Sequence, residues 1–469
     1  MQKRTKMVCT LGPAVDSFDQ IKALIAAGMN VARLNCSHGD WEAKRQWIKW
    51  IREASPDVSP IAILADLQGP KFRIGEISGG SVNLKMGEVV TLGPEPTANI
   101  PVYDQLMLSA LAQGSRVLLG DGIVELKLTS QQGSLWLAKV QSSGVVKSKQ
   151  GFTLFGKSFE TPALSEKDKS DVIEACKADV DFIALSYVKD EGDILELKEM
   201  VAKLDKGVRI CAKIETREAM KNLDAIIKVS DVLMVARGDM GLQMEIEDVP
   251  VAQKTIISKC NIAGKPVITA TQMLESMISS PRPTRAEVAD IANAILDGTD
   301  AVMLSGETAS GQYPIESATV MAKVAANAEK IFEHEHWLEH LGSKVSRLSE
   351  PTEAIAHAVA QLAMTTKPKA ILTTTTSGST ARLVSKYRPK PPILCATWDH
   401  KVFRQMAVVW GVEAIHIGLP SMTDEIVERS IAGFVKAKKL KSGDSVIITA
   451  GVPAGQPGHT NLILNEVVK

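Results

Sequence analysis

Charged residues follow two short apolar runs in the middle of the 469-residue chain, at 209–215 and 232–241. The first run ends in Lys213 and Glu215, and Asp239 follows the second. Apolar runs of this length, bounded by turn residues, are typical of strands buried on both faces of a parallel sheet. We therefore expect these side chains at the carboxyl edge of the sheet, where such folds hold their active sites. A lysine and two carboxylates are too hydrophilic to stay unpaired there. A divalent cation with an anionic substrate would satisfy all three.

The other predicted strands also end in polar residues, so a ring of them is expected at one edge. Carboxylate oxygens bind Mg2+ or Mn2+, and arginine or lysine can neutralise a phosphoryl group during its transfer. The alternative is a set of structural ion pairs that closes the top of the barrel. The ring comprises Arg33, Asn35, Ser37, Asp66, Lys213, Glu215, Arg237, Asp239, Thr271, Gln272, Ser305 and Glu307.

The segments that must position this ring alternate between strand and helix. Eight strand–helix units over roughly 260 residues match the size of a (β/α)8 TIM barrel. An open doubly wound sheet is the alternative, but it more often has a glycine-rich turn after its first strand, and T-L-G-P-A does not match. The predicted strands are 6–11, 30–35, 61–66, 182–186, 209–214, 232–236, 266–271 and 301–305.

Two segments depart from this rhythm. Residues 74–157 contain short alternating runs separated by turn residues, at 82–84, 89–92, 116–119, 124–128 and 135–140, which predicts a small inserted β-barrel lid, with hinges at Gly75 and near Gly156. A break at Ser349–Pro351 precedes a separate C-terminal α/β domain. The predicted domains are a barrel formed by 1–73 and 158–344, a lid at 74–157 and a C-terminal domain at 345–469.

Composition excludes several classes of protein. The chain has 54 basic and 54 acidic residues, so no net charge draws it toward nucleic acid or a membrane. No apolar run approaches the roughly 18 residues that span a bilayer, and the beginning of the chain has no signal-peptide pattern. The six cysteines include no C-x-x-C pair, which suits reduced thiols. We expect a cytoplasmic protein that binds neither nucleic acid nor membrane.

Longer motifs resemble the pyruvate kinase family. They include N-V-A-R-L-N-C-S-H-G, D-L-Q-G-P-K, A-K-I-E, V-A-R-G-D-M-G and I-T-A-T-Q-M-L-E-S-M, in family order through the barrel and densest from 209 to 314. The resemblance implies phosphoryl transfer from phosphoenolpyruvate to ADP, giving pyruvate and ATP in the last step of glycolysis. It also implies Mg2+ or Mn2+, a regulatory C-terminal domain, an allosteric activator and a homotetramer.

The resemblance assigns roles to individual residues. Lys213 matches the lysine that stabilises the phosphoryl group in flight, and Arg33 matches the arginine that clamps it. Glu215 and Asp239 match the carboxylates that hold the divalent metal. Four positions match substrate contacts, with Thr271 near the carbon that is protonated, and four match the nucleotide side. The former are Arg33, Gly238, Asp239 and Thr271, and the latter are Asn35, His38, Arg73 and Lys149.

The third strand departs from the family pattern. Many members read D-T-K-G-P-E and bind K+ beside the phosphate, whereas this chain has Lys71 in place of the glutamate. A tethered ammonium can supply the charge of the free ion, so we expect Lys71 to act in catalysis and K+ not to be required. The alternative is that Lys71 merely pairs with Asp66 or Glu215. The positions that match the K+ ligands are Asn35, Ser37, Asp66 and Leu67, the last of which lacks a side-chain oxygen.

A hydroxyl-rich turn in the C-terminal domain matches the loop where the family binds a phosphorylated activator. Backbone N–H groups at such a turn can cradle a phosphate, although many serine-rich turns are only helix caps. The later loop at 451–460 lacks the arginine and tryptophan of a fructose bisphosphate site, so a sugar monophosphate or AMP is the expected effector. The predicted effector residues are Thr374, Thr375, Thr376, Ser377, Ser379 and Thr380.

Two other functions remain open at this point. A metal-dependent barrel lyase or aldolase acting on an oxo acid would share the metal and the enolate chemistry, but it needs neither a nucleotide site nor a lid. A catalytically inactive metabolite sensor would use only the C-terminal turn. The presence of Lys213, Glu215 and Asp239 argues against the sensor.

Overall fold

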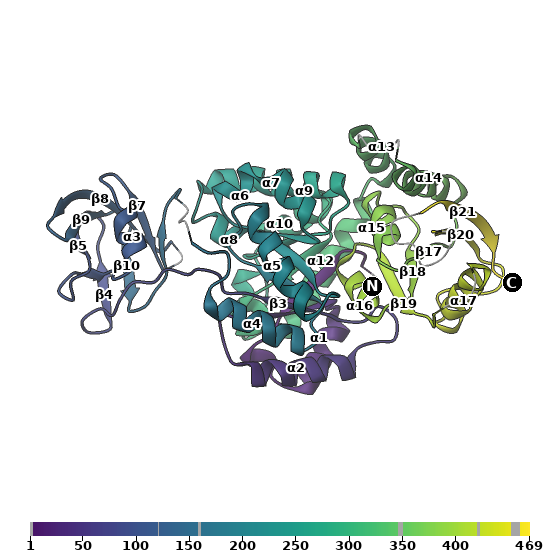
Figure 1. Cartoon of the computed structure of the whole chain (residues 1–469), viewed down its shortest axis with the longest axis horizontal. Helices are drawn as coiled ribbons and strands as arrows, with labels where there is room; N and C mark the ends of the chain where they lie inside the picture. The colour runs from purple at the N-terminus through teal and green to yellow at the C-terminus, as the bar shows by residue number, and fades with distance from the viewer. Residues whose placement is uncertain (1–2, 121, 158–160, 346–349, 420–422, 452–459) are drawn as a thin grey trace.

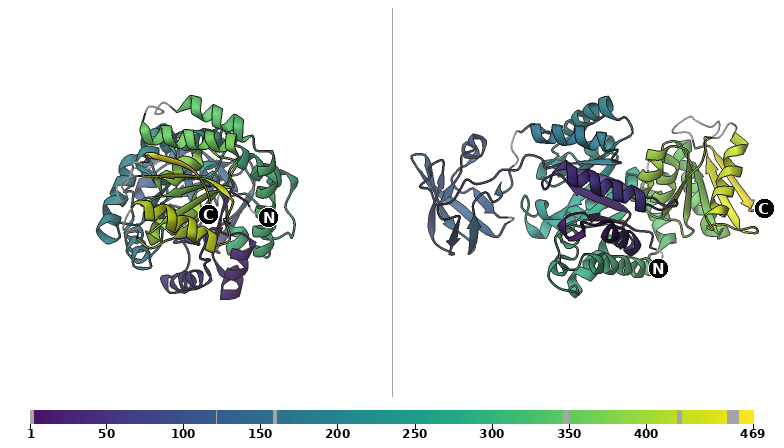
Figure 2. Two further views of the ribbon diagram at one scale, coloured as in Figure 1. Left: turned by 90° about the vertical axis from the view of Figure 1, so that its right-hand side faces the viewer. Right: turned by 90° about the horizontal axis from the view of Figure 1, so that it is seen from below.

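The structure is a computed structural model that describes residues 3–120, 122–157, 161–345, 350–419, 423–451 and 460–469. Three parts lie in a row, with the inserted domain at one end, the barrel in the middle and the C-terminal domain at the other end (Figures 1 and 2). Within the described residues, no helix has both the length and the apolar character that crossing a membrane requires.

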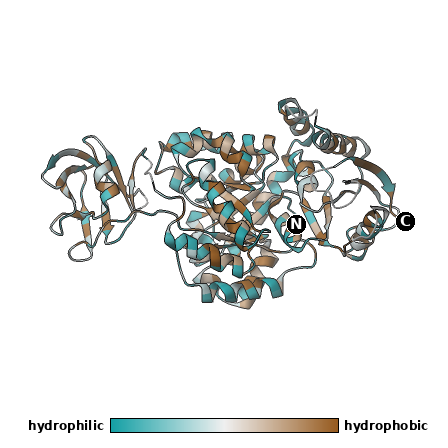
Figure 3. Ribbon diagram, in the orientation of Figure 1, coloured by the Kyte–Doolittle hydropathy of each residue, from teal (hydrophilic) through white to brown (hydrophobic). Residues whose placement is uncertain are grey.

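Eight parallel strands form the closed barrel in the order β1-β16-β15-β14-β13-β12-β3-β2, which confirms the predicted TIM barrel. Their central residues are almost all buried, because the helices cover the outer face while side chains fill the interior. Figure 3 shows both apolar and polar stretches on the helices that surround the barrel. The strands are β1 (Lys6–Thr10), β2 (Val31–Asn35), β3 (Ala62–Asp66), β12 (Phe182–Leu185), β13 (Arg209–Ile214), β14 (Val232–Ala236), β15 (Val267–Ala270) and β16 (Ala301–Leu304).

The helices around the barrel begin where the sequence places capping residues. Ser165 and Thr284 each form a capping box with an acidic residue three positions later, so the first-turn N–H groups are satisfied. The helices are α1 (Phe18–Ala27), α2 (Trp41–Ala54), α4 (Glu166–Lys177), α5 (Glu191–Leu204), α6 (Arg217–Lys221), α7 (Leu223–Val229), α8 (Arg237–Met240), α9 (Val249–Ala263), α10 (Arg285–Leu296), α11 (Gly306–Ala309), α12 (Pro314–Ala328) and α13 (His334–Lys344).

The inserted domain has its own apolar core. The sequence predicts a small β barrel, whereas hydrogen bonding among the described residues forms a six-stranded and a two-stranded sheet that do not close into one ring. The sequence also missed β6, β10, β11 and α3, which are short. The elements are β4 (Ser81–Leu84), β5 (Val89–Gly93), β6 (Ile100–Pro101), α3 (Gln105–Ala110), β7 (Arg116–Leu119), β8 (Val124–Gln132), β9 (Leu135–Val140), β10 (Gly144–Lys147) and β11 (Phe152–Leu154).

The C-terminal domain is a five-stranded sheet in the order β19-β18-β17-β20-β21, with β21 antiparallel to β20. It packs against the amino ends of the barrel strands, where Arg404 Nε donates to Asp181 Oδ1 (2.5 Å), just before β12. The exact residues at which the three domains divide remain a prediction. The elements are α14 (Pro351–Thr366), β17 (Ala370–Thr374), α15 (Ser379–Lys386), β18 (Ile393–Thr397), α16 (His400–Gln405), β19 (Val412–His416), α17 (Thr423–Lys436), β20 (Ser445–Ala450) and β21 (Leu462–Val467).

Candidate active site

Most of the predicted ring lies at the carboxyl ends of the barrel strands. Asn35 and Asp66 end β2 and β3 and are register partners. Glu215 directly follows β13, Asp239 lies in the short helix after β14, and Thr271 directly follows β15. Because all strands are parallel, these residues meet at the same mouth of the barrel, opposite the C-terminal domain.

Lys213 is the centre of a buried charge network. Its Nζ lies 2.9 Å from Glu215 Oε1 and 3.3 Å from Asp66 Oδ1, and it donates to Ser186 Oγ at 2.7 Å. Arg33 Nε donates to the other oxygen of Asp66 at 2.7 Å. The side chains of Lys213, Asp66 and Glu215 are 10%, 1% and 0% exposed. The ammonium is therefore held by two carboxylates and one hydroxyl in a largely buried site.

The pKa values of Asp66 and Glu215 shift in opposite directions, because Asp66 faces two cations and Glu215 faces one. Burial alone would raise the pKa of Asp66, but Lys213 and Arg33 outweigh burial and hold it below its usual range. Burial raises the pKa of Glu215 to about 7 despite Lys213, and Asp239 adds to this rise. Burial lowers the pKa of Lys213, but Asp66 and Glu215 more than compensate and raise it. Lys213 therefore stays charged, and Glu215 is the group that titrates near neutral pH.

Glu215 and Asp239 supply the donor set for a divalent cation. The buried Oε1 of Glu215 forms no hydrogen bond among the described residues beyond its ion pair with the Lys213 ammonium. No group of three or more His, Cys, Asp or Glu side chains in the described residues could hold a metal by itself. Mg2+ commonly takes one or two carboxylates and completes its shell with water and substrate oxygens. The two carboxylates therefore fit a metal that is shared with the substrate.

Titration of Glu215 predicts a pH-dependent affinity for the metal. A metal must displace the proton from Glu215 when the pH lies below the pKa of about 7, whereas the carboxylate is already ionised above it. We expect the dissociation constant for Mg2+ to be nearly flat above pH 8 and to rise as the pH falls below 7, approaching tenfold per unit. Calorimetric titration of the substrate-free protein measures it, with Glu215→Gln as the control that removes the titrating group. An affinity that is independent of pH from 6 to 8 would contradict the assignment.

Two residues of the site that follow β12 are absent from the ring predicted from the sequence. Ser186 Oγ accepts from Lys213 and donates to the Leu67 carbonyl oxygen at 2.7 Å. The Tyr187 N–H donates to Glu215 Oε2 at 2.7 Å, and the Tyr187 hydroxyl lies 3.4 Å from Asp239 Oδ1. Tyr187 has a φ of +56°, a strained value for a residue with a side chain that occurs preferentially at functional sites. Ser186 and Tyr187 follow the fourth barrel strand, so the expectation that active-site residues lie at the carboxyl ends of the strands would have identified them.

Tyr187 predicts a measurable contribution to metal binding. Tyr187→Phe keeps the N–H bond to Glu215 but removes the hydroxyl that orients Asp239. Loss of an outer partner of a metal ligand weakens metal binding, and this long hydrogen bond places the effect at about three- to tenfold. Calorimetry with Mg2+ on the substrate-free protein measures the change, and Tyr103→Phe, at an exposed tyrosine of the lid, is the control. Equal affinity in Tyr187→Phe and wild type would contradict this role.

Thr271 and Gly238 lie together on the next side of the mouth. The Gly238 N–H donates to Thr271 Oγ1 at 2.8 Å, and Thr271 has a φ of +68°. Arg237 supports this bend, since its Nη2 donates to the Thr271 carbonyl at 2.6 Å and its Nη1 pairs with Asp290 at 2.6 Å. For Arg237, the structural alternative therefore holds.

Glu307 is another residue of the predicted ring that stabilises the local fold. It is fully buried and accepts N–H groups from Leu274 and Ser305. Gln272 follows Thr271 and shares its positive φ, at +54°.

A cavity of about 520 Å3 separates the lid from the barrel mouth and collects the predicted nucleotide side. His38, Arg73 and Lys149 line it together with Lys71 and Asp239. Burial and the positive charges of Lys71 and Arg73 lower the pKa of His38. Lys149 is exposed and pairs with Glu76 at 2.8 Å. Lysines and arginine outnumber the carboxylates of this wall, so the cleft suits a polyphosphate. Asn35 is not part of this lining.

Lys71 is an exposed residue of the cleft wall. Within the described part of the chain it forms no ion pair, whereas Asp66 pairs with Arg33 and Lys213, and Glu215 pairs with Lys213. The alternative that Lys71 merely neutralises Asp66 or Glu215 is therefore not what the structure shows.

The positions that match the K+ ligands are already partly engaged. Asn35 Oδ1 accepts the Ser37 N–H at 3.0 Å, and both oxygens of Asp66 face cations. Leu67 presents an apolar side chain that is buried, and its carbonyl accepts from Ser186. Of these four positions, Leu67 offers a cation no side-chain oxygen, and the side-chain oxygens of Asn35 and Asp66 already face other groups.

The predicted effector turn lies in the C-terminal domain, at the opposite end of the barrel from Lys213. The Gly378 N–H donates to Thr375 Oγ1 at 2.9 Å, and Ser377 Oγ donates to Ser379 Oγ at 3.1 Å. Thr380 Oγ1 lies 2.7 Å from Thr460 Oγ1. Thr374 ends β17, and Thr376 follows in the turn. Most of the loop at 451–460 lies outside the described residues.

Comparisons with known proteins agree with this geometry. The family model described as "Pyruvate kinase, barrel domain" matches residues 2–318, and "Pyruvate kinase, alpha/beta domain" matches 353–464. A pyruvate kinase of Geobacillus stearothermophilus is 43% identical over all of this chain and 81% of its own length. One of Clostridium acetobutylicum is 40% identical over both full lengths. A crystal structure of a pyruvate kinase from Cryptosporidium parvum superposes with a TM-score of 0.92 at 35% identity, covering 100% of this chain and 96% of that one. None of these comparisons supports the lyase alternative.

Proposed function

The chain belongs to the pyruvate kinase family. We propose which residues at the strand ends bind the substrates and the metal, and which stabilise the transferring phosphoryl group. The activity is transfer of a phosphoryl group from phosphoenolpyruvate to ADP, with pyruvate and ATP as products. Such transfers need little covalent help from the protein, because positioning and charge neutralisation lower most of the barrier. The observation that carries the proposal is the buried Lys213 ammonium between Glu215 and Asp66.

Lys213 and Arg33 stabilise the phosphoryl group as it moves. The ammonium is fixed by Asp66, Glu215 and Ser186, so it need not reorganise while charge develops. Arg33 is held by Asp66 and by Thr10 Oγ1 at 2.9 Å, so its guanidinium is also fixed before the substrate binds. Glu215 and Asp239 would hold the divalent metal, which when bound neutralises charge on the phosphate and on the enolate.

Gly238 and Thr271 orient the three-carbon part of the substrate. Gly238 has room beside Thr271 for a ligand to approach the main chain, since an added Cβ would lie 3.5 Å from Thr271 Oγ1. Thr271 Oγ1 accepts from Gly238 and donates to the Ala270 carbonyl, so its position is fixed before substrate binds. We assign Thr271 to the carbon at which the enolate gains its proton.

ADP binds in the cleft between the barrel and the lid. His38, Arg73 and Lys149 line that cleft and can contact the phosphates of a nucleotide. The Arg73 guanidinium donates to the Lys149 carbonyl at 2.9 Å, which joins two segments that pair side by side at Arg73 and Gly151. Gly75 and Gly156 at the lid borders are the proposed hinges, and Gly156 has a φ of +70° that few other residues adopt.

Lys71 replaces the K+ that many family members need. It lies in the wall of the same cavity as Asp239, and it is not neutralised by Asp66 or Glu215. Its ammonium is therefore available to a phosphate that bridges the barrel mouth and the cleft.

A direct assay tests the proposed function. Pyruvate and ATP should form in equal amounts from phosphoenolpyruvate, ADP and Mg2+, with no pyruvate formed when ADP is left out. Pyruvate formation that is independent of ADP would contradict phosphoryl transfer. The same assay tests the effector proposal: a sugar monophosphate or AMP should raise the rate at low phosphoenolpyruvate, and Thr376→Val should reduce this response.

Sedimentation of the active protein tests the proposed homotetramer.

A further inference from the structure

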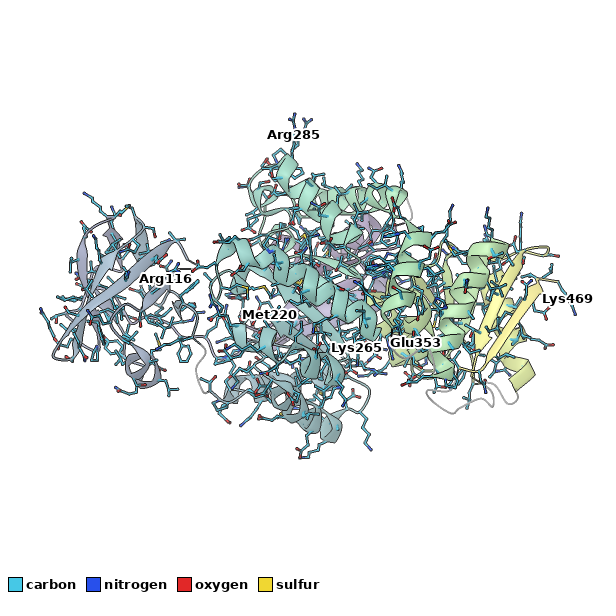
Figure 4. The ribbon with its side chains drawn as sticks, turned by 90° about the horizontal axis from the view of Figure 1, so that it is seen from above. Arg116, Met220, Lys265, Arg285, Glu353 and Lys469 are labelled. Carbon is cyan, nitrogen blue, oxygen red and sulfur yellow. The ribbon has the colours of Figure 1, made fainter. Side chains whose placement is uncertain are left out.

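A second cavity, of about 250 Å3, lies where the C-terminal domain meets the amino ends of the barrel strands. Arg209 begins β13, while Asp231 and Lys265 precede β14 and β15. Ser379 and Arg382 of α15 face them across the cavity. Figure 4 shows Lys265 at this junction of the two domains. The cavity is at the opposite end of the barrel from Lys213, so the catalytic network does not account for its charges.

The wall of this cavity carries more positive than negative charge. Asp231 is already shared, since Arg209 Nη1 lies 3.3 Å from one oxygen and Lys198 Nζ lies 3.1 Å from the other. Among the described residues, Lys265 Nζ donates to main-chain carbonyls alone, at 2.6 Å to Ser230 and 3.4 Å to Lys228. Three cations and one carboxylate line the space, which leaves a surplus of two positive charges.

Arg382 is the cation with the least compensation. One of its N–H groups donates to the Ser377 carbonyl at 3.1 Å, and it forms no ion pair with any described carboxylate. Burial lowers the pKa of Arg382 to about 10, and Arg209 adds to this. Burial also lowers the pKa of Lys265, and Arg382 and Arg209 contribute despite Asp231. A buried guanidinium that pairs with no described carboxylate favours the binding of an anion.

We propose that this interdomain cavity binds the phosphate group of a small metabolite, with Arg382 as its anchor. The planar guanidinium matches the geometry of a phosphate and can donate two parallel N–H bonds to it. A surplus of two charges suits a dianionic phosphate better than a single carboxylate. Phe182, Met406 and Val408 form an apolar part of the lining, so the phosphate is expected to be carried on a small organic body.

This site is separate from the active site, and it adjoins the predicted effector turn at Ser377 and Ser379. Ser379 lines the cavity, and the Ser377 carbonyl accepts from both Arg382 (3.1 Å) and Arg209 (3.2 Å). Thr376 is not part of the cavity lining. Substitutions at Thr376 and at Arg382 therefore distinguish the two places.

Calorimetric titration tests the proposal, with inorganic phosphate and glucose 6-phosphate as the two probes. Arg382→Gln should weaken binding of both probes to the cavity at least tenfold, and Arg382→Lys should fall between it and wild type. Tighter binding of glucose 6-phosphate than of inorganic phosphate would identify a phosphate ester as the natural ligand, and the reverse order would identify the free ion. Because Arg382 pairs with no carboxylate in the described part of the chain, its replacement is expected to leave the melting temperature within a few degrees of wild type.

Two control variants make the result decisive. Arg429→Gln removes an arginine of the same domain that is already paired with Glu425, so it should bind both probes like wild type. Thr376→Val should also retain the cavity component. Equal binding in wild type and a folded Arg382→Gln would overturn the proposal. So would a phosphate-soaked crystal with no phosphate within hydrogen-bond distance of Arg382.

Discussion

Lys213→Met is expected to lower kcat by about a thousandfold or more, with a much smaller change in the KM for ADP. Removal of a single preorganised group that stabilises developing charge typically costs 10²–10³ in rate, and groups that neutralise a transferring phosphoryl contribute up to about 10⁵. Lys213 belongs in this class because it is buried, charged and fixed by three acceptors. Steady-state assay of pyruvate formation measures the change, and turnover close to wild type would refute the role of Lys213.

The same variant also has a structural consequence that the sequence did not suggest. From the sequence alone, the substitution should spare the fold. The structure shows that it leaves Glu215 without its cation and Asp66 with only Arg33, both fully buried. Breaking a buried ion pair costs about 3 kcal/mol or more, so urea unfolding should show reduced stability that Mg2+ partly restores. Lys213→Arg keeps the charge and is the matched control for stability.

Lys71→Glu is expected to lower kcat about a hundredfold in buffer without K+, and added K+ should recover much of that loss. The substitution exchanges a cation for an anion in the wall of the cleft, beside the path of the phosphate. A free monovalent cation can then neutralise the new carboxylate, as it does in family members that carry glutamate. Initial rates over a series of K+ concentrations measure the effect, with Na+ and tetramethylammonium as ionic-strength controls.

Lys147→Glu is the matched control for that prediction. Lys147 lines the same cavity from the lid, so its replacement makes the same charge change at another part of the wall. This variant should change the KM for ADP without creating a response to K+. A K+ response of the same size in both variants would show that Lys71 has no special role.

Much of the site could be predicted because parallel strands bring their carboxyl ends to one edge. The strands β13 and β14 have the predicted bounds. The charged residues at their ends could therefore be placed at the carboxyl edge of the barrel. What could not be predicted is which charges pair. Lys213 takes both Asp66 and Glu215, and Arg237 turns toward Asp290 and the Thr271 carbonyl. Pairing depends on side-chain directions across strands, which no spacing along one strand reveals.

The strained backbone at two residues of the site also could not be predicted from the sequence. Tyr187 and Thr271 have positive φ values although neither is glycine or asparagine, so the residue types gave no signal. The short strands of the inserted domain were missed for a different reason. A strand of two or three residues, such as β6 or β11, is too short to show a period of two. The interdomain cavity needs residues from 182 to 409, which only the packing of two domains brings together.

One measurement tests most directly whether the lysines of this chain complete the charge balance of phosphoryl transfer. It is the initial rate of pyruvate formation by the wild-type protein from phosphoenolpyruvate, ADP and Mg2+ in a buffer free of K+. The structure predicts rapid, ADP-dependent formation of pyruvate that changes by less than about twofold when K+ is added, because Lys213 and Lys71 already supply the positive charge. A rate near zero without K+ that rises steeply when K+ is added would contradict it.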